Sequence, residues 1–271
     1  MIFCLSVFLF LNMVGRFEVQ DVRKNIALTY HSPQNNLSAD ALKIIAGEFK
    51  GLWADYLLLE IGAFSGSNQK ATPEDWINLR HSFDQCYALD PYFQQTYLFV
   101  QGNLPWQPKM VNETIGFLTL SKKHRPWDWY PGNYMAFDYY YFLNDYTRAS
   151  QEMLEAAKVK NAPVYLAVLG ARFAHKSRQN EAAIIILRQM IENEELADSD
   201  RSELQQRLTA LEGTWLLQKA VDQYREKHQH YPSSLEALLH EKLINTIPQN
   251  PYADRYFYDS ITGRVVFDQV K

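Results

Sequence analysis

The stretch that decides the fold is Phe137–Ala156, FDYYYFLNDYTRASQEMLEA, because its outline recurs later in the chain at Ala171–Met190, ARFAHKSRQNEAAIIILRQM. The alignment is anchored on Ala149 and Ala183, and it matches these further pairs: Phe137 with Ala171, Tyr140 with Ala174, Asn144 with Arg178, Tyr146 with Asn180, Met153 with Leu187, and Ala156 with Met190. Each copy reads as a helix, a turn and a second helix. A unit of this kind cannot bury its apolar face alone, so the repeat predicts stacked units.

The region 40–211 resembles the tetratricopeptide repeat family, whose units have the same period of about 34 residues. The resemblance rests on the helix-ending ALDP at Ala88–Pro91, the turn at Asn144–Ala149, and Ala183, while Phe137 stands where that family prefers a small residue. It implies a mostly α fold, an α-solenoid of helical hairpins followed by a small C-terminal α/β-hairpin module. It also implies a role in binding other proteins.

Two helices are expected at the start of this region, ahead of the two aligned copies. Ser38 is a suitable N-cap for a helix over residues 39–64, and apolar residues recur there at intervals of three and four, which predicts one buried face. That face consists of Leu42, Ile45, Phe49, Leu52, Tyr56 and Leu59. The second helix opens at Thr72-Pro73-Glu74-Asp75, where a cap, a proline and an acidic first turn occur together.

Aromatic residues are unusually dense between Trp127 and Tyr146. One face of a helix over residues 130–143 would pack on the second helix of its own unit and another on the neighbouring repeat. The favoured interpretation is therefore that most of these rings fill the interfaces between repeats. The remainder would line a groove that holds a peptide or a helix. The candidate groove residues are Trp106, Trp127, Trp129 and Tyr140.

The segment 212–271 differs from the repeats because strand signals appear in it. It reads as a helix over 214–228, a short helix over 234–239, and two strands over 255–258 and 264–267 around a turn. This order resembles the C-terminal part of the major pseudopilins of type II secretion. The matching residues are Tyr224, Tyr231, Pro232, Leu235, Leu238, Ile247, Pro248, Pro251, Tyr252, Tyr256, Tyr258 and Gly263. The resemblance implies a role in secretion or in a pilus-like assembly.

Residues 1–15 form an apolar segment, and residues 16–39 form a polar linker. The preferred interpretation is a signal anchor, which predicts membrane attachment with the bulk of the chain periplasmic or extracytoplasmic. A hydrophobic helix packed against the domain and a cleaved signal are the alternatives. Arg16, Arg23 and Lys24 follow the segment and count against export, so the orientation stays open.

Composition and motifs exclude several function classes. The net charge of −4 and the absence of a Lys/Arg run argue against nucleic acid as a partner. Cys4 and Cys86 give neither a disulfide framework nor zinc-ligand spacing, and no metal or cofactor is expected. Patterns for phosphate loops, dinucleotide binding and hydrolase nucleophiles are absent.

Two hypotheses about function follow. The first is a non-enzymatic, membrane-anchored scaffold whose protein partners are envelope or secretion components. The second is an enzyme acting on glycans in the aromatic groove, which would need two carboxylates at roughly 5–10 Å. Asp128 and Asp138 are the nearby candidates, and Asp138 lies close to the expected packing face.

Overall fold

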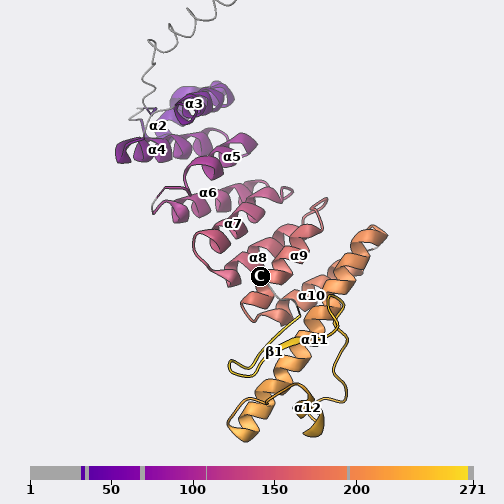
Figure 1. Ribbon diagram of the computed structural model, residues 1–271. Helices are drawn as coiled ribbons and strands as arrows, with labels where there is room; N and C mark the ends of the chain where they lie inside the picture. Colours follow the sequence, from indigo (N-terminus) through magenta and orange to yellow (C-terminus); the bar gives the residue numbers. More distant parts are fainter. Residues whose placement is uncertain (1–31, 34–36, 68–70, 108, 194–195, 268–271) are drawn as a thin grey trace, which may run out of the picture. The chain divides into compact units, whose positions relative to one another are not determined.

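The computed structural model describes residues 32–33, 37–67, 71–107, 109–193 and 196–267. This part of the chain is mostly helical and ends in a two-stranded antiparallel sheet, as predicted (Figure 1). The expected anchor at residues 1–15 lies outside the described residues, as does most of the linker. Within the described ranges, no helix has the length and apolar character needed to span a bilayer.

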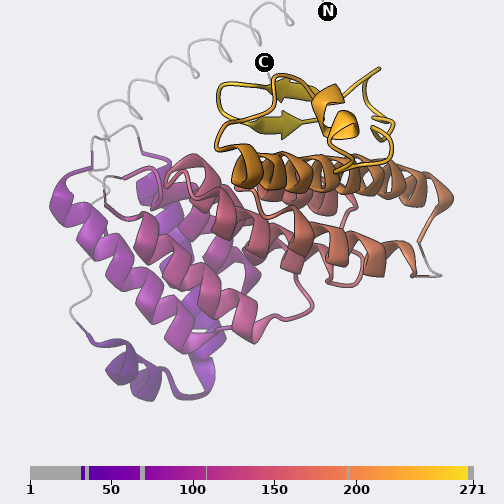
Figure 2. The ribbon, with the colours of Figure 1, turned by 90° about the horizontal axis from the view of Figure 1, so that it is seen from below.

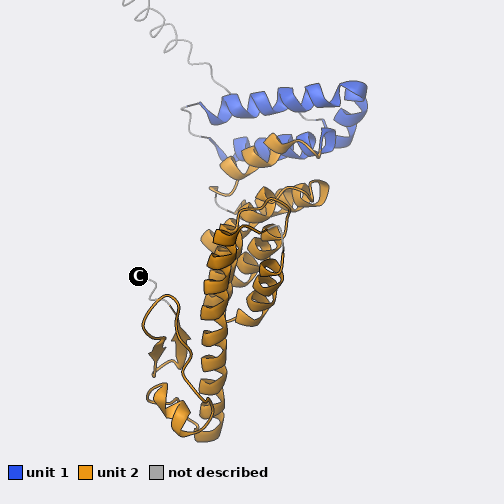
Figure 3. Cartoon of the chain, turned by 90° about the vertical axis from the view of Figure 1, so that its right-hand side faces the viewer, with its two compact units in different colours: residues 1–90 blue, residues 91–271 orange. Residues whose placement is uncertain are grey.

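The chain divides into two compact units, residues 1–90 and 91–271 (coloured separately in Figure 3). The first unit contains α2 (Ala39–Ala46), the 3₁₀ turn η1 (Gly47–Phe49), α3 (Lys50–Ser65) and α4 (Pro73–Leu89). The predicted helix starts are confirmed. Ser38 Oγ accepts a hydrogen bond from Ala41 N, and Thr72 and Asp75 form a reciprocal capping box.

The predicted buried face of the first helical segment is wrong in most of its members. Leu42 is buried, but the other five predicted members are exposed. The buried side of α3 is the opposite one, which packs on α4 and consists of Ala54, Leu57, Leu58, Ile61 and Phe64. Helix α3 is thus apolar on two opposite faces, so periodicity alone could not choose between them.

The second unit begins with α5 (Gln94–Asn103), α6 (Val111–His124), α7 (Tyr130–Tyr141) and α8 (Tyr146–Ala157). It continues with α9 (Tyr165–Lys176), α10 (Asn180–Ile191) and α11 (Asp198–His228). From α5 to α11, each helix packs against the next along the chain. The repeat is visible in this geometry, because α8 and α10 begin at aligned positions, Tyr146 and Asn180, and also end at aligned positions.

The turns before α8 and α10 share a backbone feature. Asn144 and Arg178, which the repeat alignment pairs, both adopt left-handed conformations, with φ of 52° and 62°. Asp145 then caps α8, where its carboxylate accepts a hydrogen bond from Arg148 N at 2.9 Å. Left-handed residues end helices by turning the chain sharply. The two hairpins therefore turn at the same repeat position.

Helices α8 and α9 approach closely where α9 has no side chain. A Cβ on Gly170 would lie 2.8 Å from Leu154 Cγ, and Ser150 Oγ donates a hydrogen bond to Gly170 O at 2.9 Å. Ala149 and Ala183, the anchors of the repeat alignment, are both fully buried. Small residues at these points allow the helix axes to come together, as the repeat pattern predicts.

The last part of the chain lies along α11. The expected boundary between residues 211 and 212 falls inside this helix, which runs without a break for 31 residues. Helix α12 (Glu236–His240) and strands β1 (Phe257–Asp259) and β2 (Arg264–Val266) follow it. In Figure 2 the hairpin lies beside α11, and the Gln218 side chain joins them by accepting from Val265 N and donating to Gly263 O.

The predicted hairpin is confirmed. Strands β1 and β2 pair antiparallel with Tyr258 opposite Val265, and Gly263 closes the turn at φ 69°. A Cβ on Gly263 would lie 2.2 Å from Tyr231 Cε1, so the tyrosine ring lies directly on this glycine. Tyr256 packs in the same way on Gly213 of α11. The Tyr256 contact thus fixes the tail to α11, and the Tyr231 contact fixes the hairpin turn within the tail.

Candidate functional site

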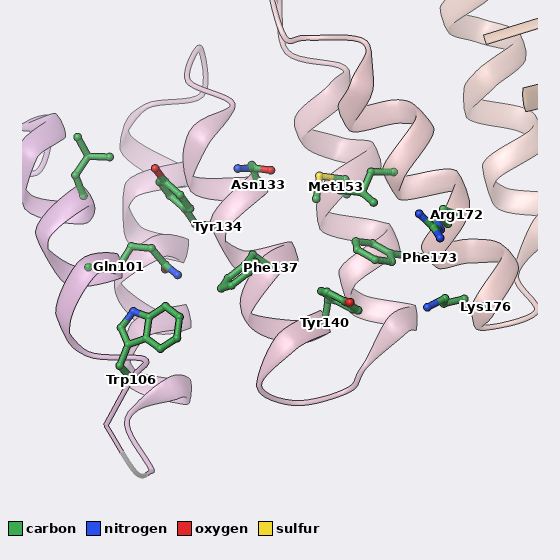
Figure 4. A pocket seen from close by; sticks show the side chains of 13 residues that line it. Gln101, Trp106, Asn133, Tyr134, Phe137, Tyr140, Met153, Arg172, Phe173 and Lys176 are labelled. Carbon is green, nitrogen blue, oxygen red and sulfur yellow. The ribbon is translucent and has the colours of Figure 1, made fainter. Parts of the chain in front are cut away.

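A cavity of about 780 Å³ opens between α5, α7, α8 and α9 in the second unit. We call it the aromatic cavity, and it is lined by Leu98, Gln101, Gly102, Trp106, Asn133, Tyr134, Phe137, Tyr140, Met153, Leu169, Arg172, Phe173 and Lys176. In Figure 4, Trp106 lies at one end, Arg172 and Lys176 at the other, and Phe137 and Tyr140 between them. The volume and the mostly apolar lining are typical of a binding site.

Two of the four predicted groove residues line this cavity. Trp106 is 55% exposed and packs edge-on against Phe142, with ring centroids 5.2 Å apart. Tyr140 stacks on Phe173 of α9 at 4.9 Å. These contacts fix the rings from more than one helix, and a ring held in place loses little further freedom when a ligand binds.

Trp127 and Trp129 line a different cavity, of about 580 Å³, near the start of α7 and the end of α8. Trp127 is 59% exposed and stacks on Tyr92, with ring centroids 6.4 Å apart. Trp129 stacks on Tyr130 at 3.8 Å. The four predicted residues therefore do not form one surface.

The aromatic side chains of residues 127–146 are not the buried residues of this region. Every ring between residues 127 and 146 keeps at least partial exposure, whereas the buried positions of α7 are Pro131, Gly132, Met135, Ala136 and Asp138. The favoured interpretation, that these rings mainly fill interfaces, therefore holds only in part. Some of them, such as Tyr140 and Tyr146, pack on the core from its edge. Others line the two cavities.

A buried polar pair lies behind the aromatic cavity. Gln101 Nε2 donates a hydrogen bond to Asp138 Oδ1 at 2.8 Å, and both side chains are buried. Among the described residues, Asp138 Oδ2 and Gln101 Oε1 have no hydrogen-bond partner. Burial raises the pKa of Asp138 to about 7, although the bond from Gln101 acts in the other direction. Gln101 thus joins the cavity wall to a buried carboxyl, and its own Oε1 is a buried acceptor.

One end of the aromatic cavity is positively charged. Arg172 and Lys176 are one turn apart on α9, and no described carboxylate lies within ion-pair distance of either. Lys176 Nζ lies 5.1 Å from the centre of the Tyr146 ring. No carboxylate is among the described residues that line the cavity. An anionic group on a ligand would therefore meet two uncompensated charges.

The two carboxylates considered for glycan chemistry, Asp128 and Asp138, have different surroundings. Asp128 accepts hydrogen bonds from Tyr97 Oη at 2.7 Å and Arg125 Nε at 2.9 Å, which orient its carboxylate into the protein. Asp138 is fully buried. Asp128 precedes α7 and Asp138 lies within it, and neither is among the described residues that line the aromatic cavity.

The part of the chain that the structure describes contains no candidate metal site. No group of three or more His, Cys, Asp or Glu side chains is close enough there to hold an ion. In the hairpin turn, Asp259 accepts hydrogen bonds from Ile261 N and Thr262 Oγ1. Its carboxylate therefore closes the turn.

Most of the cavity lining is not evident from the sequence. The aromatic pattern favours packing for Tyr134 and Phe137, and it does not single out Gln101, Arg172 or Lys176. The spacing of Arg172 and Lys176 places both on one face of a helix, which is an available signal. Nothing in the sequence, however, indicates that this face of α9 meets α5 and α7 at one cavity.

Comparison of the chain with models of protein families, with curated proteins and with solved structures finds no match. Its function is therefore inferred from the residues and geometry of the chain itself.

Proposed function

We propose that this protein is a non-enzymatic scaffold that binds a segment of a partner protein in the aromatic cavity. The observation that carries the proposal is a cavity with aromatic walls, a positive end and no lining carboxylate among the described residues. The fitting ligand is a peptide segment with apolar or aromatic side chains for the walls and an acidic side chain for Arg172 and Lys176. Fixed rings and unpaired cations favour such a segment over a basic or fully apolar one.

We also propose that the region 40–211 is an α-solenoid of tetratricopeptide-like hairpins. It is supported by the shared turn position at Asn144 and Arg178 and by the consecutive packing of helices from α5 to α11. The C-terminal hairpin against α11 is the part that we compare with pseudopilins. With an anchor at residues 1–15, the scaffold would serve an envelope, secretion or pilus-like assembly.

A glycan-acting enzyme is the alternative. It would require two carboxylates facing the groove aromatics. The described lining of the aromatic cavity supplies none, whereas Asp128 and Glu155 line the cavity of Trp127 and Trp129. Asp128 accepts hydrogen bonds from Tyr97 and Arg125, and Glu155 pairs with Lys158, so both carboxylates are already engaged. The positive end of the cavity favours an acidic ligand over a neutral sugar. The binding hypothesis is therefore preferred.

The test is binding of a fluorescent peptide that contains Trp, Phe and Glu to the full chain, measured by anisotropy. The double variant R172E/K176E should weaken binding at least tenfold at low salt, and Phe137→Ala should weaken it as well. Trp127→Ala is the matched control, because Trp127 lies in the other cavity and its loss should leave the affinity unchanged. Equal affinity for a peptide with Lys in place of Glu, or dependence on Trp127 alone, would contradict the proposal.

A further inference from the structure

The exposed side of α3 in the first unit, together with Phe49 directly before it, carries a regular apolar row. Phe49, Leu52, Tyr56 and Leu59 recur at intervals of three, four and three, and their exposed fractions lie between 49% and 73%. We call this row the α3 seam. Alternating intervals of three and four are the pattern by which one helix packs along another.

The seam is too large to be incidental exposure. Ile44, Ile45 and Trp53 are further large apolar residues exposed on the same two-helix segment. The four seam side chains by themselves expose an area on the order of several hundred Å², the scale at which apolar patches mark an interaction site. Because α3 already buries its opposite face on α4, the seam is a second face of the same helix with no described partner.

The positions beside the seam specify the charge of its occupant. On one flank lie Glu48 and Asp55, both exposed, and on the other lie Trp53 and Glu60. Glu60 accepts a hydrogen bond from Tyr56 Oη, and the Trp53 and Tyr56 rings meet edge to face at 6.0 Å. Lys50 is on the α4 side of the helix, because it lies one turn before the buried Ala54. The flanks of the α3 seam itself are therefore acidic or aromatic, and the exposed Lys43 lies on α2, before the seam.

We propose that the α3 seam docks a basic amphipathic helix of a partner protein, with apolar residues at three-four spacing and Lys or Arg beside them. Such a helix pairs its apolar row with the seam and its cations with Glu48, Asp55 and Glu60. A second copy of this chain fits less well, because it would bring acidic flanks against acidic flanks. The surface is independent of the aromatic cavity, which lies in the second unit and favours an acidic segment.

The test uses two synthetic fluorescent helices of about 18 residues, long enough to cover α3 at roughly 1.5 Å per residue. Both carry leucines at three-four spacing, one with Lys at the flanking positions and one with Glu. With the full chain, the Lys peptide should bind at least tenfold more tightly than the Glu peptide. The preference should shrink as salt is added, because the flanking charges are exposed.

Variants identify the seam as the binding surface. The double substitution L52Q/L59Q should lower the affinity for the Lys peptide at least tenfold. The double substitution E48K/D55K should make the Glu peptide the tighter binder. These side chains are exposed, so the fold should be retained, and unchanged circular dichroism would verify that. Leu216→Gln, at an exposed leucine of α11, is the matched control and should have no effect.

Three outcomes would overturn the proposal. The first is equal binding of the two peptides, and the second is no effect of L52Q/L59Q. The third comes from a photoreactive residue at position 59 in the full chain without peptide. Crosslinking to a second copy, or to residues 1–15 of the same chain, would show that a different occupant covers the seam.

Discussion

Asp138 offers the sharpest test of the packing behind the aromatic cavity, through the change Asp138→Asn. The carboxyl is fully buried, one oxygen accepts from Gln101, and the other has no partner in the described part of the chain. Burial raises its pKa to about 7, because a buried carboxylate loses its hydration. An unfolded chain has a pKa of about 3.9 for the same group.

The sign of the effect follows from this difference. The protonated, neutral form suits the buried position, so the contribution of Asp138 to stability is intact below a pH of about 3.9. It is lost progressively as the pH rises from about 3.9 to about 7. A gap of about three pKa units corresponds to about 4 kcal/mol. Asparagine stays neutral, so Asp138→Asn should be more stable than the parent by up to about 4 kcal/mol at pH 8 and nearly equal at pH 4.

The assay is urea unfolding of the full chain at pH 4, 6 and 8, followed by fluorescence and circular dichroism. The matched control is Asp128→Asn. That carboxylate accepts hydrogen bonds from Tyr97 and Arg125, and each bond to a charged group is worth about 1.5–3 kcal/mol. The control should therefore be less stable than the parent at pH 8. If Asp138→Asn also loses stability at pH 8, or if its effect does not change with pH, the reasoning about burial is refuted.

Three glycine substitutions test the close contacts of the fold, each by the change in free energy of unfolding. Gly170→Ala should cost about 1–3 kcal/mol, since its Cβ would lie 2.8 Å from Leu154 Cγ. Gly116→Ala, in an exposed helix interior with no atom within 4 Å of the new Cβ, should instead stabilise by up to about 1 kcal/mol. Gly263→Ala should destabilise and should expose Tyr231 to quenchers, because the turn is left-handed and the ring fills the Cβ position. Equal effects of Gly170→Ala and Gly116→Ala would contradict the close approach of α8 and α9.

Local signals in the sequence determined where the helices and the hairpin occur. The capping box at Thr72 and Asp75, the turn residue Asn144 and the glycine at 263 act within a few residues, so each can be identified without the rest of the chain. The repeat offset between Ala149 and Ala183 likewise indicated paired helices with close-packed small residues. These features depend on backbone geometry near each residue.

Only the tertiary structure decided which faces are buried and which side chains meet. Helix α3 has two apolar faces, and its periodicity fits burial of either, so the choice depended on what α4 could cover. Trp106 and Arg172 are far apart in the sequence but line the same aromatic cavity. No local sequence pattern predicts that the two residues share a cavity. Burial of Asp138 arises in the same way, because desolvation is a property of all the surrounding helices and not of one segment.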